Sequence, residues 1–146
     1  MNNLPAQTEI PDGEILYRYC NPQAFPKGQT DIPTSIFNDR EMSCDWERYQ
    51  KNPFSSFHIR EGKSCVIQIT VCDAIRNPTN PRRVGQVEPA WRQDIIHSPV
   101  SAEDDTVHGA NQAHSLIRGS KRMPVVEAIR DNASFFTGAA SICNYP

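Results

Sequence analysis

Residues 107–136 read VHGANQAHSLIRGSKRMPVVEAIRDNASFF and contain the strongest fold signals of the 146-residue chain. Residues 112–117 alternate between apolar and polar side chains well enough to predict a strand. Gly119 and Ser120 predict a turn, and Pro124 stands where the first turn of a helix tolerates proline. Apolar side chains then recur at helical spacing, at Val125, Ala128, Ile129 and Ala133. This spacing predicts a helix of about three turns, so we expect the rest of the chain to pack against a strand, a turn and a helix.

Two upstream segments carry further strong signals. Residues 14–20 are rich in β-formers and predict a first strand, and residues 63–71 alternate most clearly of all. Residues 42–50 predict a short helix, with Ser43 as its N-cap and two aromatic side chains on one face. Weaker patterns predict short extended or strand segments at residues 35–37, 57–60, 84–88 and 94–98, a helical turn at 72–76 and a loop at 77–83.

The fold class predicted from these elements is α+β, as a single small domain of five or six short strands and two helices. Twelve prolines against seven glycines predict short elements and many loops. We expect residues 1–13 to be an extended lead-in, 14–142 to be the domain and 143–146 to be a tail. Phe135, Phe136 and Ile142 are further candidates for the core, and Gly138 is a candidate helix stop.

The bulk composition excludes some classes of protein. A formal charge of −2 argues against wholesale attraction to nucleic acid or to anionic membranes, and no apolar run has the roughly 20 residues that span a bilayer. The first residues show no secretory signal, and the five cysteines include no C-x-x-C pair. We therefore expect reduced thiols and a cytoplasmic location, with no membrane association.

The first candidate site is a phosphate-binding site formed by His114, Arg118, Ser120 and Lys121. A strand, a turn and a helix start bring backbone N–H groups and a lysine together, which suits an anion. An unperturbed histidine titrates near pH ~6.5, so His114 could serve there as a catalytic acid or base. The alternative interpretation is a structural histidine beside a solvated charged turn, and it is the more common case.

Two other kinds of site have weaker support. His108 and His114 are six residues apart, which fits no zinc module, so we expect no metal ion; no motif indicates a cofactor, and none is expected. A cysteine or Ser115 with a histidine base would form a nucleophilic pair, but no G-x-S-x-G elbow is present.

Basic residues interleaved with aromatic ones suggest a nucleic-acid contact as a minority interpretation. The basic residues are Arg82, Arg83, Arg118, Lys121 and Arg122, and the aromatic candidates for stacking are Trp91 and Tyr17.

Arg18 is a further ligand-binding candidate. Its place on a first strand, near Ser43 and Asp45, resembles ADP-ribosyltransferase-like folds, in which a strand arginine or histidine holds the dinucleotide. The later glutamate of such folds has no convincing counterpart, since Glu127 lies on a predicted helix. We expect Arg18 to form an ion pair, for example with an aspartate.

The ordered combination of LYRYCNP, MSCDW and AHSLIRGSK resembles a small uncharacterised prokaryotic protein family. The resemblance covers residues 16–129 and implies a bacterial cytosolic protein acting beside neighbours encoded nearby. It implies no activity, substrate or catalytic residue.

The leading functional hypothesis is a non-catalytic interaction or accessory domain with a protein partner. Catalytic motifs are absent, and four aromatic side chains are available as interface anchors: Trp46, Tyr49, Phe57 and Trp91. The second hypothesis is an enzyme or sensor for a phosphate-bearing, nucleotide-like ligand at His114, Arg118 and Lys121. The third is a nucleic-acid accessory protein.

Overall fold

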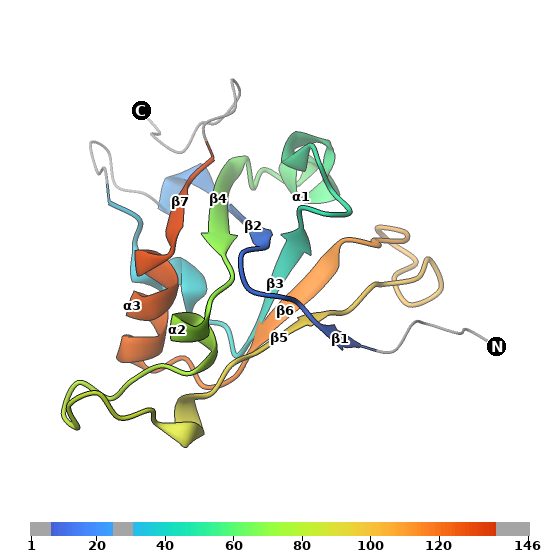
Figure 1. The fold of residues 1–146 in the computed structure, drawn as a ribbon. Coiled ribbons are helices and arrows are strands. Elements are labelled where there is room, and N and C mark those ends of the chain that lie inside the picture. Colours follow the sequence, from blue (N-terminus) through green and yellow to red (C-terminus); the bar gives the residue numbers. More distant parts are fainter. Residues whose placement is uncertain (1–6, 25–30, 137–146) are drawn as a thin grey trace.

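The computed structural model describes residues 7–24 and 31–136, and in this part of the chain seven strands form one sheet. Every pair of neighbouring strands is antiparallel, and the order across the sheet is β1-β5-β6-β3-β2-β4-β7 (Figure 1). The strands are β1 (Thr8–Glu9), β2 (Ile15–Cys20), β3 (Glu41–Trp46), β4 (Cys65–Thr70), β5 (Asp94–His97), β6 (His114–Arg118) and β7 (Ala133–Phe135).

Short helices cover the sheet and connect its strands. The α-helices are α1 (Phe57–Arg60), α2 (Asp73–Arg76) and α3 (Met123–Asp131). The 3₁₀ helices are η1 (Pro22–Ala24), η2 (Thr34–Phe37), η3 (Pro53–Ser55) and η4 (Pro89–Trp91). Helix α3 packs against η2 and α2 on the left of Figure 1, whereas α1 lies at the upper right.

The main core lies between one face of the sheet and α3. Val125, Val126 and Ile129 of α3 are buried in the same cluster as alternate residues of the central strands, including Ile67 and Ile117. Alternate residues of a strand point to opposite faces, so this cluster defines one face of the sheet. Burying several large aliphatic side chains here, at roughly 1.5–3 kcal/mol each, supplies most of the driving force for folding.

The opposite face of the sheet has a smaller core and a polar centre. Tyr17, Tyr19 and Val66 form a second buried cluster, against which Phe54 and Ile59 pack from η3 and α1. The intervening residues of β3, Ser43 and Asp45, also belong to this face, because Met42, Cys44 and Trp46 are part of the main core. A buried polar region therefore lies beneath α1.

The prediction of a mixed α and β domain is confirmed at that level, but the sheet dominates and has more strands than predicted. The strand predictions at 14–20, 63–71, 94–98 and 112–117 correspond to β2, β4, β5 and β6. The predicted turn of helix at 72–76 is α2, and the helix after Pro124 is α3, which ends at Asp131. Ala133, predicted to belong to that helix, begins β7 instead.

The predicted helix at 42–50 is wrong, because residues 41–46 form β3. This strand lies between β2 and β6 and pairs with both. The Trp46 and Tyr49 rings do meet, with centroids 5.4 Å apart, but across the turn that follows the strand. Pairing with two neighbours and burial of alternate side chains outweigh the weak helix signal given by Ser43.

Three smaller predictions are also wrong. Residues 57–60 form the single turn of α1 rather than a strand, and η2 replaces the extended segment at 35–37. Residues 84–88 form no strand; Val87 only makes an isolated bridge with Thr79. Gly138 and Ile142 lie outside the described residues, while Phe135 and Phe136 are partly buried.

The cysteines differ in their states. Cys20, Cys44 and Cys72 are free thiols, whereas Cys65 is disulfide-bonded, so the expectation of reduced thiols is wrong for Cys65. Burial raises the pKa of Cys20 to about 11 and that of Cys44 to about 12, which makes both thiols poor nucleophiles. Among the described residues, no helix is both long and apolar enough to cross a membrane.

Candidate functional site

A row of three polar side chains crosses the centre of the second face. Tyr17 of β2 is the register partner of Asp45 of β3, and Asp45 is the register partner of His114 of β6. Register partners in antiparallel strands place their side chains on the same face, a few ångströms apart. The sheet itself therefore holds His114 beside Asp45, with no contribution from a flexible loop.

The hydrogen bonds of His114 fix its tautomer. Its Nδ1 atom lies 2.7 Å from the carbonyl oxygen of Ser98, and only a protonated Nδ1 can make that bond. In the neutral ring Nε2 then carries the lone pair, and it lies 3.4 Å from the hydroxyl oxygen of Ser43. His114 thus presents a proton acceptor on the side away from Ser98.

The acceptor nitrogen borders a small pocket of about 170 Å³. The sheet forms the floor, α1 one wall, and the long hairpin 98–113 the other wall. The lining residues are Ser43, His58, Val100, Asp105, Gly109, Asn111 and His114. Mutual hydrogen bonds between the backbones of Val100 and Asn111 hold the base of the hairpin together. At this volume, below the roughly 300 Å³ of typical ligand pockets, the pocket suits a small molecule or one group of a larger one.

Asp45 lies directly behind the pocket and is almost completely buried, with 1% of its surface exposed. Its carboxyl group accepts hydrogen bonds from the Tyr19 hydroxyl at 3.0 Å, the Ser56 hydroxyl at 3.3 Å and the Asn111 amide at 2.9 Å. These donors come from β2, from the residue before α1 and from the hairpin. Asp45 therefore ties all three walls of the pocket to the sheet.

His58 forms part of the wall on α1. Its ring stacks on Tyr19, with centroids 5.0 Å apart and planes 18° from parallel. Burial lowers the pKa of His58, whereas burial and the nearby Asp45 raise the pKa of Tyr19. Both shifts favour the neutral forms of these two side chains at the pocket wall.

A third histidine fastens the tip of the hairpin. His108 Nδ1 lies 3.0 Å from the Asp105 carboxylate, and Nε2 lies 2.6 Å from the Glu61 carboxylate next to α1. Hydrogen bonds to Asp105 and then to Glu61 raise the pKa of His108. Because Asp105 also lines the pocket, this clamp connects the hairpin to α1 across the mouth of the pocket.

The predicted group of His114, Arg118, Ser120 and Lys121 is not brought together. Arg118 is four residues further along β6, about 13 Å at a rise of about 3.3 Å per residue, and it pairs with Glu41 at 3.2 Å. Ser120 contributes its carbonyl oxygen to Gln93.

Lys121 turns inward rather than toward solvent. Its ammonium group donates to the carbonyl oxygens of Arg40, Ile117 and Gly119, and burial lowers its pKa to about 8. All three of its donors are used, so Lys121 closes the turn between β6 and α3 and offers little to a phosphate.

Arg18 lies on the other face of the sheet from the pocket, among residues of the main core. Its guanidinium donates to the carbonyl oxygens of Ile36 and Ser43 and pairs with Asp39 at 2.8 Å. The predicted ion pair with an aspartate is confirmed. The Arg18 side chain does not reach Asp45, which faces the pocket.

The remaining predictions concern nucleophiles and metals. The Ser115 hydroxyl is fully buried and donates to the carbonyl oxygen of Ala113, so Ser43 rather than Ser115 is the serine beside a histidine. No group of three or more histidine, cysteine or acidic side chains in the described residues could hold a metal ion.

The wall residues other than His114 were missed as a set. Asp45 and Asn111 are 66 residues apart in the sequence, and His58 belongs to a third segment. A partial signal existed, because a polar residue in alternation with Met42, Cys44 and Trp46 indicates a strand with a polar face.

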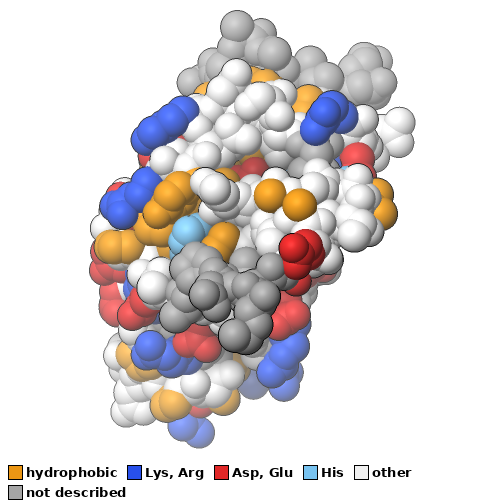
Figure 2. All heavy atoms as spheres, turned by 90° about the vertical axis from the view of Figure 1, so that its right-hand side faces the viewer, with side chains coloured by type: hydrophobic (Ala, Val, Ile, Leu, Met, Phe, Trp, Pro, Cys, Tyr) orange, Lys and Arg blue, Asp and Glu red, His pale blue; other side chains and the backbone are white. Residues whose placement is uncertain are grey.

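Two larger hollows lie elsewhere. One of about 440 Å³ is lined by Tyr49, His97, Pro99, Val100, Ser101, Ala102, Ala110 and Gln112, on the opposite face of the hairpin from the histidine pocket. Tyr49 is 49% exposed and stacks on His97, with ring centroids 4.7 Å apart. Figure 2 views the molecule from the side of the hairpin and shows hydrophobic side chains around a histidine, with acidic side chains close by.

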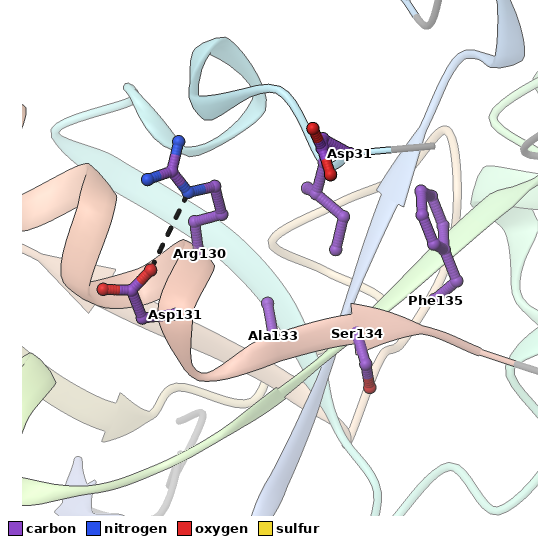
Figure 3. A pocket seen from close by; sticks show the side chains of 7 residues that line it. Asp31, Arg130, Asp131, Ala133, Ser134 and Phe135 are labelled. Carbon is purple, nitrogen blue, oxygen red and sulfur yellow. Dashed lines mark ion pairs between the residues drawn. The ribbon is translucent and has the colours of Figure 1, made fainter. Parts of the chain in front are cut away.

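The other hollow, of about 580 Å³, lies between β7, the end of α3 and the segment before η2. Figure 3 shows Asp31, Arg130 and Phe135 on one side of β7 and Ser134 pointing to the other side. Arg130 pairs with its neighbour Asp131 at 3.8 Å. Its charged side chains are exposed and no buried polar group faces it, so we assign it no ligand.

Comparisons of the chain with family models, with curated proteins and with solved structures gave no match. The class of protein is therefore defined by the fold and the pocket alone. It is a strand-rich, antiparallel α and β domain with a histidine-lined pocket on one face of its sheet.

Proposed function

We propose that the protein binds a small polar ligand in the histidine-lined pocket and that His114 accepts a proton from it. The observation that carries this proposal is the orientation of the imidazole. The bond from Nδ1 to the Ser98 carbonyl leaves Nε2 as an acceptor at the pocket, beside the Ser43 hydroxyl. Such an oriented, second-bonded imidazole is the arrangement that general bases require.

The lining of the pocket favours a ligand that donates hydrogen bonds. Its chargeable members are His58, Asp105 and His114, and Asp45 lies behind them. No arginine or lysine is among the lining residues. We therefore place a neutral hydroxyl compound or an amine in this pocket, and not the phosphate-bearing ligand expected from the sequence.

A ligand-observed NMR screen tests this proposal. The probes are small polyols, small amines and phosphate monoesters of similar size, offered to the wild type and to His114→Asn. Asparagine keeps a donor near the position of Nδ1 for the Ser98 carbonyl but has no basic nitrogen. We expect polyols or amines to bind the wild type and to lose roughly tenfold or more in affinity in the variant.

The control is His97→Asn, which removes an imidazole outside the pocket and should leave binding unchanged. Binding of phosphate esters alone, or equal binding to His114→Asn, would contradict the proposal.

The second candidate function is the interaction domain predicted from the sequence, with a protein partner in a cytoplasmic assembly of a prokaryotic cell. The observation in its favour is the groove beside Tyr49, which combines a half-exposed aromatic ring with Pro99, Val100 and Ala102. Exposed aromatic anchors beside apolar hollows are typical of interface centres.

Affinity purification from the native host tests this second function. A specific partner should be recovered with the wild type and lost with Tyr49→Ser. Val84→Ser is the matched control, because Val84 is 95% exposed and lies away from this groove. Recovery of the same proteins with both variants would exclude the Tyr49 groove as their binding site.

A further inference from the structure

A third groove, separate from the histidine-lined pocket, combines an indole ring with unpaired arginines. It has a volume of about 430 Å³ and is lined by Asn80, Pro81, Arg82, Trp91, Arg122, Met123 and Pro124. We propose that this arginine–tryptophan groove binds a nucleotide, either free or as a unit of a single strand. Arg82 and Arg122 would bind the phosphate, and Trp91 would stack on the base.

One wall of the groove is a loop that orders itself. The Asn80 side chain accepts from the backbone N–H of Arg82 at 2.9 Å, and Arg83 N–H donates to the Asn80 carbonyl at 3.0 Å. Gly85 turns the chain back with φ 74°, and Gln86 and Asn80 bond through their backbones. The loop thus holds Arg82 and Arg83 at a fixed place while their side chains stay exposed.

The other wall is the start of α3, and one buried side chain links it to Trp91. Gln93 is fully buried, and its amide nitrogen donates to the carbonyl oxygens of Trp91 at 2.9 Å and Ser120 at 2.8 Å. Ser120 lies two residues before Arg122. The Gln93 amide therefore sets the distance between the indole and the start of α3, so the groove is preorganised and loses little entropy on binding.

The charge balance favours an anion. Within the described residues, the side chains of Arg82, Arg83 and Arg122 make no ion pair and no hydrogen bond to protein. Two carboxylates on the same elements are engaged: Glu88 with Asn80 at 3.5 Å and Asp94 with Arg92 at 3.7 Å. Unpaired guanidinium groups around one hollow are suited to forked hydrogen bonds with a phosphate group.

The indole supplies the second half of the recognition. Part of Trp91 packs against the main core, which fixes the ring, and the remainder lines the groove. A fixed aromatic ring beside cationic side chains binds a planar base by stacking and its phosphate by charge. The groove volume falls within the roughly 300–1,000 Å³ of small-molecule sites.

Three probes test the proposal: inorganic phosphate, AMP and a fluorescently labelled strand of twelve thymidines. Binding of phosphate and AMP is measured by calorimetry, and binding of the strand by anisotropy over a range of salt concentrations. The test variant is Arg82→Gln with Arg122→Gln. The control, Lys51→Gln with Arg130→Gln, removes the same charge from two exposed side chains elsewhere.

We expect AMP, the strand or both to bind more tightly than phosphate and to lose roughly tenfold or more in affinity in the test variant only. For the strand, the slope of log affinity against log salt should fall in magnitude by about 2. Binding of AMP alone identifies a free nucleotide as the ligand, and binding of the strand alone identifies a single strand. Absence of binding, equal binding of phosphate and AMP, or equal losses in both variants would overturn the proposal.

Discussion

His114 and Asp45 are register partners in neighbouring strands, and their side chains meet on the face of the sheet opposite α3. Asp45 is buried and bonded to donors from three segments, whereas His114 borders the pocket with one ring nitrogen held by the Ser98 carbonyl. The carboxylate thus has a structural role that positions the pocket, and the imidazole has the chemical role. The two residues predict different outcomes on mutation.

Replacement of Asp45 should destabilise the fold. Asp45→Ala leaves three buried donors without their acceptor, and we expect a loss of roughly 3 kcal/mol or more. Tyr19→Phe removes one of these bonds and should cost about 2 kcal/mol. Urea unfolding followed by circular dichroism measures both losses, and Glu127→Ala on the exposed face of α3 is the control. A loss below about 0.5 kcal/mol for Asp45→Ala would show that its hydrogen bonds do not hold the three walls together.

Gly119 should tolerate no side chain. Its φ is 152°, and a Cβ atom there would lie 2.6 Å from the carbonyl oxygen of Arg92 and from the Gln93 amide. We expect Gly119→Ala to cost about 2–4 kcal/mol, because strained backbone adds to a clash. Gly85→Ala is the matched control, since Gly85 also has positive φ but open space around it, and it should cost about 1 kcal/mol. Equal thermal unfolding shifts for the two variants would contradict the clash.

The clamp formed by His108 should depend on pH. Carboxylate partners raise the pKa of His108 above 6.5, so its contribution is complete below that value and is lost as the pH rises through the raised pKa. Hydrogen bonds from His108 lower the pKa of Asp105 below 3.8, so its contribution is lost as the pH falls through the lowered pKa.

The tip of the hairpin should therefore be most ordered in the mildly acidic range between these limits. Backbone NMR order parameters of residues 101–109, measured from mildly acidic to basic pH, check this expectation. They should fall with rising pH in the wild type and show no such change in His108→Gln, where no imidazole titrates. The same pH dependence in the variant would exclude the clamp as its cause.

Segments whose own alternation matches their burial could be predicted from the sequence. β4 is the clearest example, because its apolar side chains alternate along the strand and Cys65, Ile67 and Ile69 are fully buried. α3 was predicted from the spacing of Val125 and Ile129, which both pack in the main core. In these elements the local pattern and the tertiary environment favour the same structure.

β3 and the pocket could not be predicted in the same way. Ser43 and Asp45 are polar residues that become buried only because α1 and the hairpin cover them, and nothing local in the sequence indicates that cover. Lys121 shows the opposite error: a lysine in a charged turn indicated solvent exposure, yet three nearby carbonyl groups draw its ammonium inward. Contacts between distant segments decided both outcomes.

The measurement that tests the central claim most directly is a ¹⁵N NMR spectrum of the imidazole rings at a pH above about 8, where an ordinary imidazole is neutral. The His114→Asn variant assigns the His114 signals. The account predicts a protonated Nδ1, bonded to the Ser98 carbonyl, and an unprotonated Nε2 whose shift changes when a polyol or amine binds. A protonated Nε2, or an Nε2 shift unaffected by every ligand that binds, would contradict the role of His114 as the proton acceptor of this pocket.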